Sequence, residues 1–171
     1  MFYAGIGARN APQNILDSCM FIAQKLESMG YTLRSGGADG CDSAFEAGAI
    51  NKEIYLPWKG FNHSKSELYF GKLSNSEYDR CKDIASKLYP GWDNADPAVK
   101  KLHARNVLQI LGPAKTTYSA FVICWTNRPP EQARGTMFGV HLAHQHNIPV
   151  YNLYIPENVT KLLEFLKISN L

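Results

Sequence analysis

The chain has 171 residues, of which 45% are hydrophobic and 19% charged, so its composition is that of a globular protein and its length predicts a single domain over 1–171. The formal net charge of only +3 and the absence of a run of Lys or Arg argue against a polyanionic partner, so we do not expect nucleic acid binding. The cysteines lie far apart without a C-x-x-C pair, which argues against a zinc ribbon. The sequence shows neither a signal-peptide pattern nor a run of about 18 consecutive apolar residues. We therefore expect a cytoplasmic protein that crosses no membrane.

Short apolar runs and amphipathic helical patterns alternate along the chain. In chain order they predict a strand over 2–7, a helix over 12–29, a strand over 31–34, a helix over 42–50, a strand over 53–57, helices over 76–88 and 96–111, a strand over 121–125, a helix over 135–146, a strand over 148–153 and a helix over 159–166. Residues 58–96 break the alternation and are predicted to be an aromatic-rich insertion.

This alternation predicts an α/β fold: a three-layer, Rossmann-like parallel sheet of about five strands in the order 3-2-1-4-5, with helices on both faces. In such a sheet, ligands bind beyond the carboxyl ends of the strands, at the point where the strand order reverses. Here that point lies between the first and fourth strands, and it gathers the loops over 5–10, 36–42 and 125–136.

The second of these loops, Gly36-Gly-Ala-Asp-Gly-Cys-Asp42, connects a strand to a helix. Glycine tolerates positive φ, and free N–H groups at a helix start suit an anion, so the loop is a candidate for half of a nucleotide site. A tight turn without a ligand is the alternative. Because Asp39 and Asp42 would repel a phosphate, we expect them to contact ribose hydroxyls or to cap the helix, and we favour the cap for Asp42. Ser43 and Glu46 have the spacing of a capping box.

The neighbouring loops supply further candidates. Arg9 follows the first strand, where its guanidinium can clamp a phosphate, and a surface arginine without a partner is the alternative. Gly135 and Thr136 offer an N–H group and a hydroxyl at a helix start, as a second anion site or as a plain N-cap. Trp58 and Trp125 directly follow strands and are the aromatic residues that we expect near a base.

Segments from all three loops together resemble the SLOG superfamily: Tyr3-Ala-Gly-Ile-Gly-Ala-Arg9, Ser35-Gly-Gly-Ala-Asp-Gly-Cys-Asp42 and Arg134-Gly-Thr136. This group includes the Rossmann domain of DNA-processing protein A (Smf) and the Lonely-guy nucleoside-monophosphate phosphoribohydrolases. The resemblance covers nearly the whole chain, least well over 58–96, and the layout resembles small stand-alone members that bacteriophages often carry. It implies a nucleotide or nucleotide-derived ligand at the glycine loops.

The phosphoribohydrolases of that group use an arginine in a Met-His-x-Arg-Lys element and a glutamate in a Pro-Gly-Gly-x-Gly-Thr-x-x-Glu element. Leu102-His-Ala-Arg-Asn106 matches the first element at His103 and Arg105, whereas the second survives only in part, with Gly139 in place of the glutamate. Cleavage of an N-glycosidic bond needs a carboxylate beside an oxocarbenium-like state. The departure therefore disfavours catalysis unless Glu131 or an aspartate of the glycine loop substitutes.

The resemblance favours a binding protein for a nucleotide-derived signal, of the ADP-ribose or cyclic-nucleotide type, which a phage protein would sequester in the host cytoplasm. One alternative is a nucleotide N-glycosidase with Arg105 and Glu131 as candidate catalytic residues, and another is a DNA-recombination accessory protein that binds single-stranded DNA. We expect a homo-oligomer and no cofactor, and no metal, because His141, His144 and His146 lack the spacing of a helical zinc motif. The expected ligand-binding residues are Gly5, Gly7, Ala8, Arg9, Ser35, Gly36, Gly37, Asp39, Asp42, Trp58, Arg105, Trp125, Arg134, Gly135 and Thr136.

Overall fold

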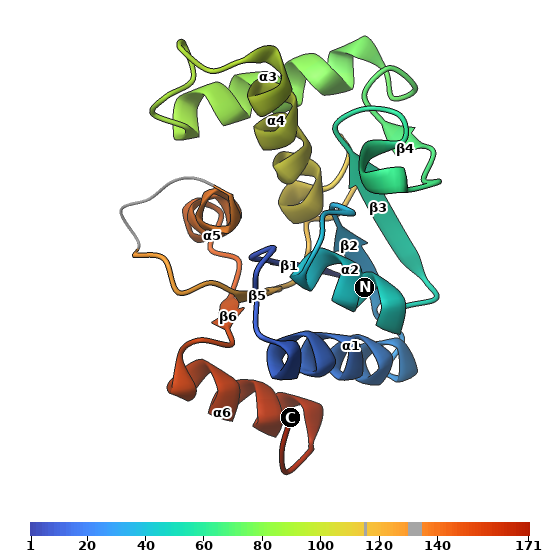
Figure 1. The fold of residues 1–171 in the computed structure, drawn as a ribbon, viewed down its shortest axis with the longest axis vertical. Coiled ribbons are helices and arrows are strands. Elements are labelled where there is room, and N and C mark those ends of the chain that lie inside the picture. The colour runs from blue at the N-terminus through green and yellow to red at the C-terminus, as the bar shows by residue number, and fades with distance from the viewer. Residues whose placement is uncertain (115, 130–134) are drawn as a thin grey trace.

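The computed structural model describes residues 1–114, 116–129 and 135–171, which Figure 1 shows as a ribbon. Its strands are β1 (Phe2–Gly7), β2 (Thr32–Ser35), β3 (Lys52–Leu56), β4 (Leu68–Tyr69), β5 (Val122–Trp125) and β6 (Val150–Asn152). Its helices are α1 (Gln13–Ser28), α2 (Cys41–Gly48), α3 (Asn75–Leu88), α4 (Pro97–Leu111), α5 (Thr136–Gln145) and α6 (Pro156–Leu166), and a 3-10 turn, η1 (Phe61–His63), precedes β4. Within the described ranges, no helix combines the length and the apolar character that a membrane crossing requires.

The described strands form one parallel sheet in the order β4-β3-β2-β1-β5-β6. This confirms the predicted Rossmann-like α/β fold and the predicted order of the strands that correspond to β1, β2, β3, β5 and β6. Strand β4 has no predicted counterpart, because a strand of 2 residues is too short to show an alternating pattern. In register, Gly5 of β1 lies beside Ile123 of β5, so the carboxyl ends of these neighbours meet at one edge.

Alternate residues of each central strand point into different apolar layers. From β5, Val122 and Cys124 pack with α4 and α5, and α3 packs in turn on α4. Ile123 and Trp125 pack instead with α1, α2 and α6. Figure 1 shows these two groups of helices on opposite sides of the sheet. The cysteines are buried as free thiols.

Helix α2 begins where the chain passes very close to the loop after β1. Gly40 is its N-cap residue with φ 78°, and a Cβ there would lie 2.4 Å from the carbonyl oxygen of Ala8, so only glycine fits. The predicted capping box is wrong, because the helix already begins at Cys41 and Ser43 therefore lies inside the first turn. The Ser43 hydroxyl donates instead to the carbonyl of Ala38 at 2.6 Å.

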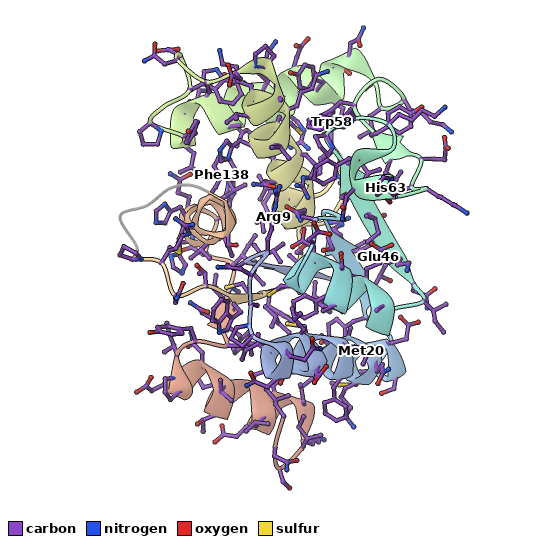
Figure 2. All side chains as sticks on the ribbon, in the orientation of Figure 1. Arg9, Met20, Glu46, Trp58, His63 and Phe138 are labelled. Carbon is purple, nitrogen blue, oxygen red and sulfur yellow. The ribbon has the colours of Figure 1, made fainter. Side chains whose placement is uncertain are left out.

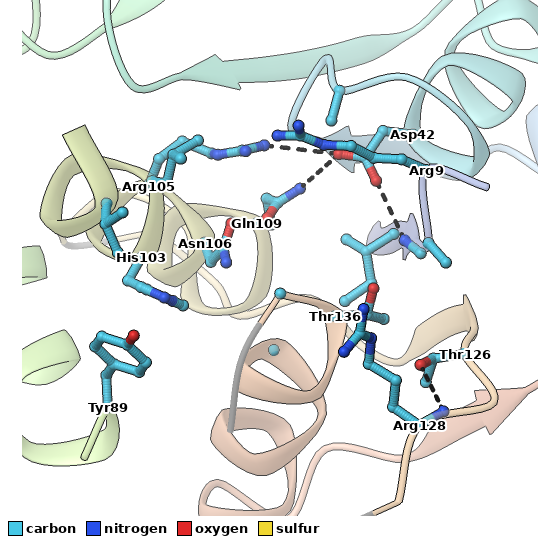
Figure 3. Close-up of a pocket in the computed structure, with 18 of the residues that line it drawn as sticks. Arg9, Asp42, Tyr89, His103, Arg105, Asn106, Gln109, Thr126, Arg128 and Thr136 are labelled. Carbon is cyan, nitrogen blue, oxygen red and sulfur yellow. Dashed lines mark hydrogen bonds and ion pairs between the residues drawn. The ribbon is translucent and has the colours of Figure 1, made fainter. Parts of the chain in front are cut away.

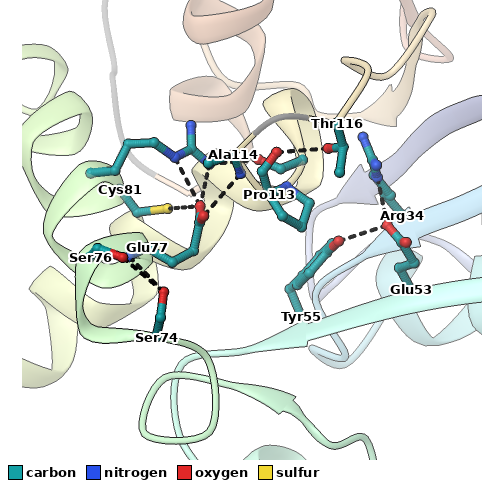
Figure 4. A network of polar contacts seen from close by, with 12 residues as sticks. Arg34, Glu53, Tyr55, Ser74, Ser76, Glu77, Cys81, Pro113, Ala114 and Thr116 are labelled. Carbon is teal, nitrogen blue, oxygen red and sulfur yellow. Dashed lines mark hydrogen bonds and ion pairs between the residues drawn. The ribbon is translucent and has the colours of Figure 1, made fainter.

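A polar network fastens the end of α4 to α3, as Figure 4 shows. The buried Glu77 carboxylate accepts the backbone N–H of Ala114 at 2.9 Å and Nε of Arg80 at 2.9 Å. Arg80 also donates to the carbonyl of Gly112, the residue that ends α4, at 2.6 Å. These bonds hold the C-terminal end of α4 at a fixed position relative to α3.

A second cluster joins β2 and β3 to the chain between α4 and β5 (Figure 4). Arg34 is fully buried, and its Nε donates to Glu53 at 2.7 Å while its Nη1 donates to the carbonyl of Thr117 at 2.7 Å. The Tyr55 hydroxyl donates to the same carboxylate at 2.6 Å. A Cβ at Gly112 would lie 2.4 Å from Nη1 of Arg34, so this guanidinium requires a glycine at the end of α4.

Replacement of Glu77 by alanine should destabilise the fold, because the Ala114 N–H would lose its acceptor and the Arg80 guanidinium its carboxylate partner. We expect the free energy of unfolding to fall by about 2–3 kcal/mol, measured by urea unfolding followed by circular dichroism. Glu67→Ala, which removes an exposed carboxylate paired with Lys72, is the matched control and should leave the unfolding midpoint unchanged. Equal midpoints for the two variants would contradict the role assigned to Glu77.

Candidate functional site

A cavity of about 560 Å³ lies beyond the carboxyl ends of β1 and β5, where the strand order reverses (Figure 3). Its walls are the loops after these strands, the first turns of α2 and α5, and one face of α4. The predicted ligand-binding residues that line it are Gly7, Ala8, Arg9, Asp42, Arg105, Gly135 and Thr136. Two further candidates, Glu131 and Arg134, lie outside the described residues.

Other candidates from the glycine loops lie behind the cavity wall rather than in it. The Ser35 hydroxyl donates to the carbonyl of Gly5 at 2.6 Å, and a Cβ at Gly5 would lie 2.6 Å from an aromatic ring of α2. Gly36 makes room for Arg105, because a Cβ there would lie 1.2 Å from Nη1 of that side chain. Gly37 has φ 64°, a conformation that favours glycine. These residues shape the site by packing, and none of them lines the cavity.

Further side chains that were predicted near the ligand also lie elsewhere. Asp39 accepts a hydrogen bond from Nδ2 of Asn62 at 3.0 Å. Trp58 packs edge-on against Phe61, with ring centroids 5.3 Å apart. Trp125 points into the layer of α1, α2 and α6 and does not line the cavity. The alternation of side chains along β5 thus turns this aromatic ring away from the cavity.

Helix α4 contributes more of the wall than the sequence indicated. His103, Asn106 and Gln109 line the cavity together with Arg105, and they follow one another at three-residue spacing. Polar residues that recur at this spacing lie on one face of a helix, and this recurrence is the signal in the sequence. The cavity is also lined by side chains that were not among the expected ligand-binding residues, namely Tyr89, Val99, Leu102, Thr126 and Arg128.

Arg105 is a buried cation in this wall (Figure 3). Its side chain is 5% exposed, and its Nη1 lies 3.6 Å from Oδ2 of Asp42, beyond the usual range of a hydrogen bond. Among the described residues, neither Nε nor Nη1 of Arg105 has a hydrogen-bond partner. Burial lowers the pKa of Arg105 to about 10 and Asp42 acts in the opposite sense, so the guanidinium is charged at neutral pH. A buried charge with unused donors favours an anionic acceptor.

Asp42 connects three elements at the cavity. Its Oδ1 accepts the backbone N–H of Gly7 at 3.2 Å, and its Oδ2 faces Arg105 and Nε2 of Gln109, the latter at 3.5 Å. The cap expected of Asp42 is not formed, because Gly40 is the N-cap residue and Asp42 lies within the first turn of α2. Burial raises the pKa of Asp42 to about 6, although Arg105 and backbone hydrogen bonds act against this rise. Asp42 is the only carboxylate among the described lining residues.

The remaining polar wall is positive. Arg9, after β1, and Arg128, after β5, both line the cavity from exposed positions. Gly135 and Thr136 open α5, whose first N–H groups have no carbonyl partner within the helix. Guanidinium groups and a helix N-terminus at one cavity suit a phosphate or another anion.

Gly139 lies in the cavity wall, at the position where the sequence resemblance leads one to expect a glutamate. A Cβ at Gly139 would lie 2.8 Å from Cδ1 of Ile6, so the wall is closely packed there. Across the part of the chain that the structure describes, no three His, Cys, Asp or Glu side chains gather as a metal site requires. Of the helix-end histidines, His146 lies edge-on to Tyr118, with ring centroids 5.3 Å apart.

No protein-family model matches this chain, and no curated protein matches its sequence. Among solved structures, the chain is similar to DNA processing protein A from Helicobacter pylori, in a structure that concerns the single-stranded DNA binding mode of that protein. The TM-score is 0.51 and the sequence identity 16%, over 99% of this chain and 74% of that chain. This likeness shows a shared Rossmann-like α/β fold.

The raised pKa of Asp42 predicts a pH dependence of stability. Because this pKa rises from 3.8 to about 6 on folding, the folded protein binds a proton between these values that the unfolded chain does not. The contribution of Asp42 to stability is therefore greatest below about pH 4 and falls as the pH rises through about 6. In Asp42→Asn this fall is absent. The unfolding free energy of the variant minus that of the wild type should therefore increase by up to about 3 kcal/mol between pH 4 and pH 7.

Urea unfolding of both proteins at pH 4, 5, 6 and 7 measures this difference. The interaction of Asp42 with Arg105 is already included in the Asp42 pKa, and Arg105 stays protonated over this pH range. The change with pH therefore isolates the carboxylate. Asp93→Asn, at an exposed position, is the control, and its unfolding free energy should change with pH as that of the wild type does. Parallel curves for Asp42→Asn would contradict the raised pKa.

Proposed function

We propose that this chain, on the fold that it shares with DNA processing protein A, binds a nucleotide or a nucleotide-derived anion in the cavity beside β1 and β5. The observation that carries this proposal is Arg105, a buried guanidinium whose Nε and Nη1 have no hydrogen-bond acceptor among the described residues. Phosphate oxygens would supply those acceptors. Hydrogen bonds between charged groups are strong where water is largely excluded.

The surroundings of Arg105 support an anion of nucleotide size. Arg9 and the N-terminus of α5 face the same cavity, so a ligand with more than one phosphate oxygen would meet several donors. The volume of about 560 Å³ lies within the range of roughly 300–1,000 Å³ that is typical of small-molecule sites. ADP-ribose-type compounds and cyclic nucleotides combine phosphate, sugar and base at this size and are the ligands that we propose.

We favour retention of the ligand over its conversion. Gly139 brings no carboxylate to the wall, and the carboxylate of Asp42 is engaged by the Gly7 N–H and faces Arg105. A protein that binds a nucleotide signal without destroying it acts by sequestering or sensing it. Sequestration of a host signal would suit a phage-borne protein.

A nucleotide N-glycosidase is the second candidate, and one observation favours it. Asp42 is a cavity-lining carboxylate with a pKa of about 6, a value that suits general acid–base chemistry near neutral pH. With Arg105 3.6 Å away, the pair could stabilise charge during cleavage of a glycosidic bond.

Single-stranded DNA binding is a third candidate, because the similar structure from Helicobacter pylori concerns that activity. It requires a positive path for the backbone beyond the cavity, and the net charge of +3 offers little for one. A gel shift with a single-stranded oligonucleotide at low salt tests it, and a retarded band that disappears steeply with added salt would favour DNA over a free nucleotide.

Arg105→Met should weaken ligand binding, because it removes the buried donors and keeps an apolar chain in their place. We expect the affinity for AMP, cyclic AMP or ADP-ribose, whichever binds most tightly to the wild type, to fall about 10- to 100-fold in calorimetric titrations. Lys101→Met, which removes a positive charge from the same helix outside the cavity, is the matched control and should keep wild-type affinity. An equal loss of affinity in both variants would mean that Arg105 acts only through the net charge of the protein.

Incubation of the protein with the same nucleotides distinguishes retention from hydrolysis. We expect chromatography of the denatured mixture to return each nucleotide intact, because Gly139 supplies no catalytic carboxylate. Release of free base by the wild type, abolished in Asp42→Asn, would replace the binding proposal with the N-glycosidase. Mass spectrometry of small molecules released from freshly purified protein would identify a ligand that is already bound.

A further inference from the structure

One corner of the cavity is apolar and aromatic, and the phosphate contacts proposed above leave it unused. Tyr89, the first residue after α3, lines this corner with Val99, Leu102 and His103 of α4. Figure 3 shows Tyr89 and His103 on one side of the cavity and Arg9 on the other. The cavity therefore has two chemically different ends.

The rings of the aromatic corner pack against one another and against the core. The rings of Tyr89 and His103 are stacked, with centroids 4.2 Å apart and an angle of 24° between their planes. His103 packs in turn on Phe138 of α5, at 4.9 Å between centroids. Tyr89 is 9% exposed and His103 6% exposed, so both rings are held by the core while still lining the cavity. A preformed wall of this kind orders no side chain when a flat ligand binds.

Helix α4 connects this corner to the charged end. Leu102 and Gln109 are seven residues apart along the helix, which corresponds to roughly 10 Å of axial rise. Asn106 lies between them, and its amide offers both a donor and an acceptor. Arg105, one residue before Asn106, extends its side chain toward Asp42, and Gln109 donates to the same carboxylate. One helix face thus brings apolar, amide and charged groups to the same cavity.

We propose that the corner formed by Tyr89, Val99, Leu102 and His103 holds the base of the ligand, while Arg105 and Arg9 hold its phosphate. This inference rests on the proposed function and narrows its ligand to a compound in which a heteroaromatic base and a phosphate lie at opposite ends of a sugar. Asn106 is then placed to hydrogen-bond the sugar. The site does not suit a sugar phosphate without a base, because the apolar corner would remain unfilled.

Calorimetric titration with paired probes tests the base subsite. The tightest binder among AMP, GMP, CMP and UMP is compared with ribose 5-phosphate, which carries the same sugar and phosphate without a base. We expect the wild type to bind that nucleotide at least about tenfold more tightly, since stacking and apolar contact with a base contribute affinity. The Tyr89→Leu variant should bind that nucleotide about tenfold more weakly than the wild type does, and its affinity for ribose 5-phosphate should stay within about twofold of the wild-type value.

Two further variants separate the ring from the fold. Tyr89→Phe keeps the ring and should retain wild-type affinity for the nucleotide, whereas Tyr118→Leu removes an exposed tyrosine outside the cavity and should change neither affinity. The unchanged affinity of Tyr89→Leu for ribose 5-phosphate also verifies that this variant is folded.

The possible outcomes distinguish the two proposals. Equal wild-type affinities for the nucleotide and ribose 5-phosphate would overturn the base subsite and leave the anion site standing. An equal loss of both affinities in Tyr89→Leu would overturn it as well, because the ring would then act only through the fold. Binding of none of these probes by the wild type would overturn the base subsite, and it would overturn the proposed function as well only if cyclic AMP and ADP-ribose also fail to bind.

Discussion

The site depends on one buried carboxylate, Asp42, which contacts three elements that are far apart in sequence. It accepts the N–H of Gly7 at the end of β1, lies in the first turn of α2 and faces Arg105 and Gln109 on α4. Burial disfavours the charged form of each partner, and their proximity offsets only part of that cost. The pair is therefore weak as a source of stability and strong as a positioning device: it holds a guanidinium at the cavity with donors still unused.

Close packing explains the glycine loop better than a phosphate cradle does. Gly36 leaves the space that the Arg105 guanidinium occupies, and Gly40 lets the start of α2 touch the loop after β1. Neither position tolerates a Cβ. The loop thus contributes to an anion site indirectly, by admitting the cation that would bind it. A glycine-rich turn between a strand and a helix can serve a site without touching its ligand.

The sequence predicted the α/β fold, the order of its central strands and the place of the cavity, because these follow from local periodicity and from the handedness of parallel crossovers. It predicted Arg9, Asp42 and Arg105 at the cavity through their positions beside strand ends and within recognisable segments. Tyr89 could not be singled out from the other aromatic residues over 58–96, because its place depends on how α3 packs against α4. The direction of the Trp125 side chain depends on the register of β5, because a shift of one residue turns every side chain of a strand to the opposite face of the sheet. The sequence alone does not fix this register.

The two outermost strands of the sheet are also its shortest, with 2 residues in β4 and 3 in β6. A parallel sheet has unpaired backbone groups along both outer strands, and long exposed edges of this kind recruit strands from other molecules. Here the exposed ladder is only a few hydrogen bonds long on each side. Copies of this chain consequently have little edge to share, and their association would have to use helices and loops instead of an extended sheet.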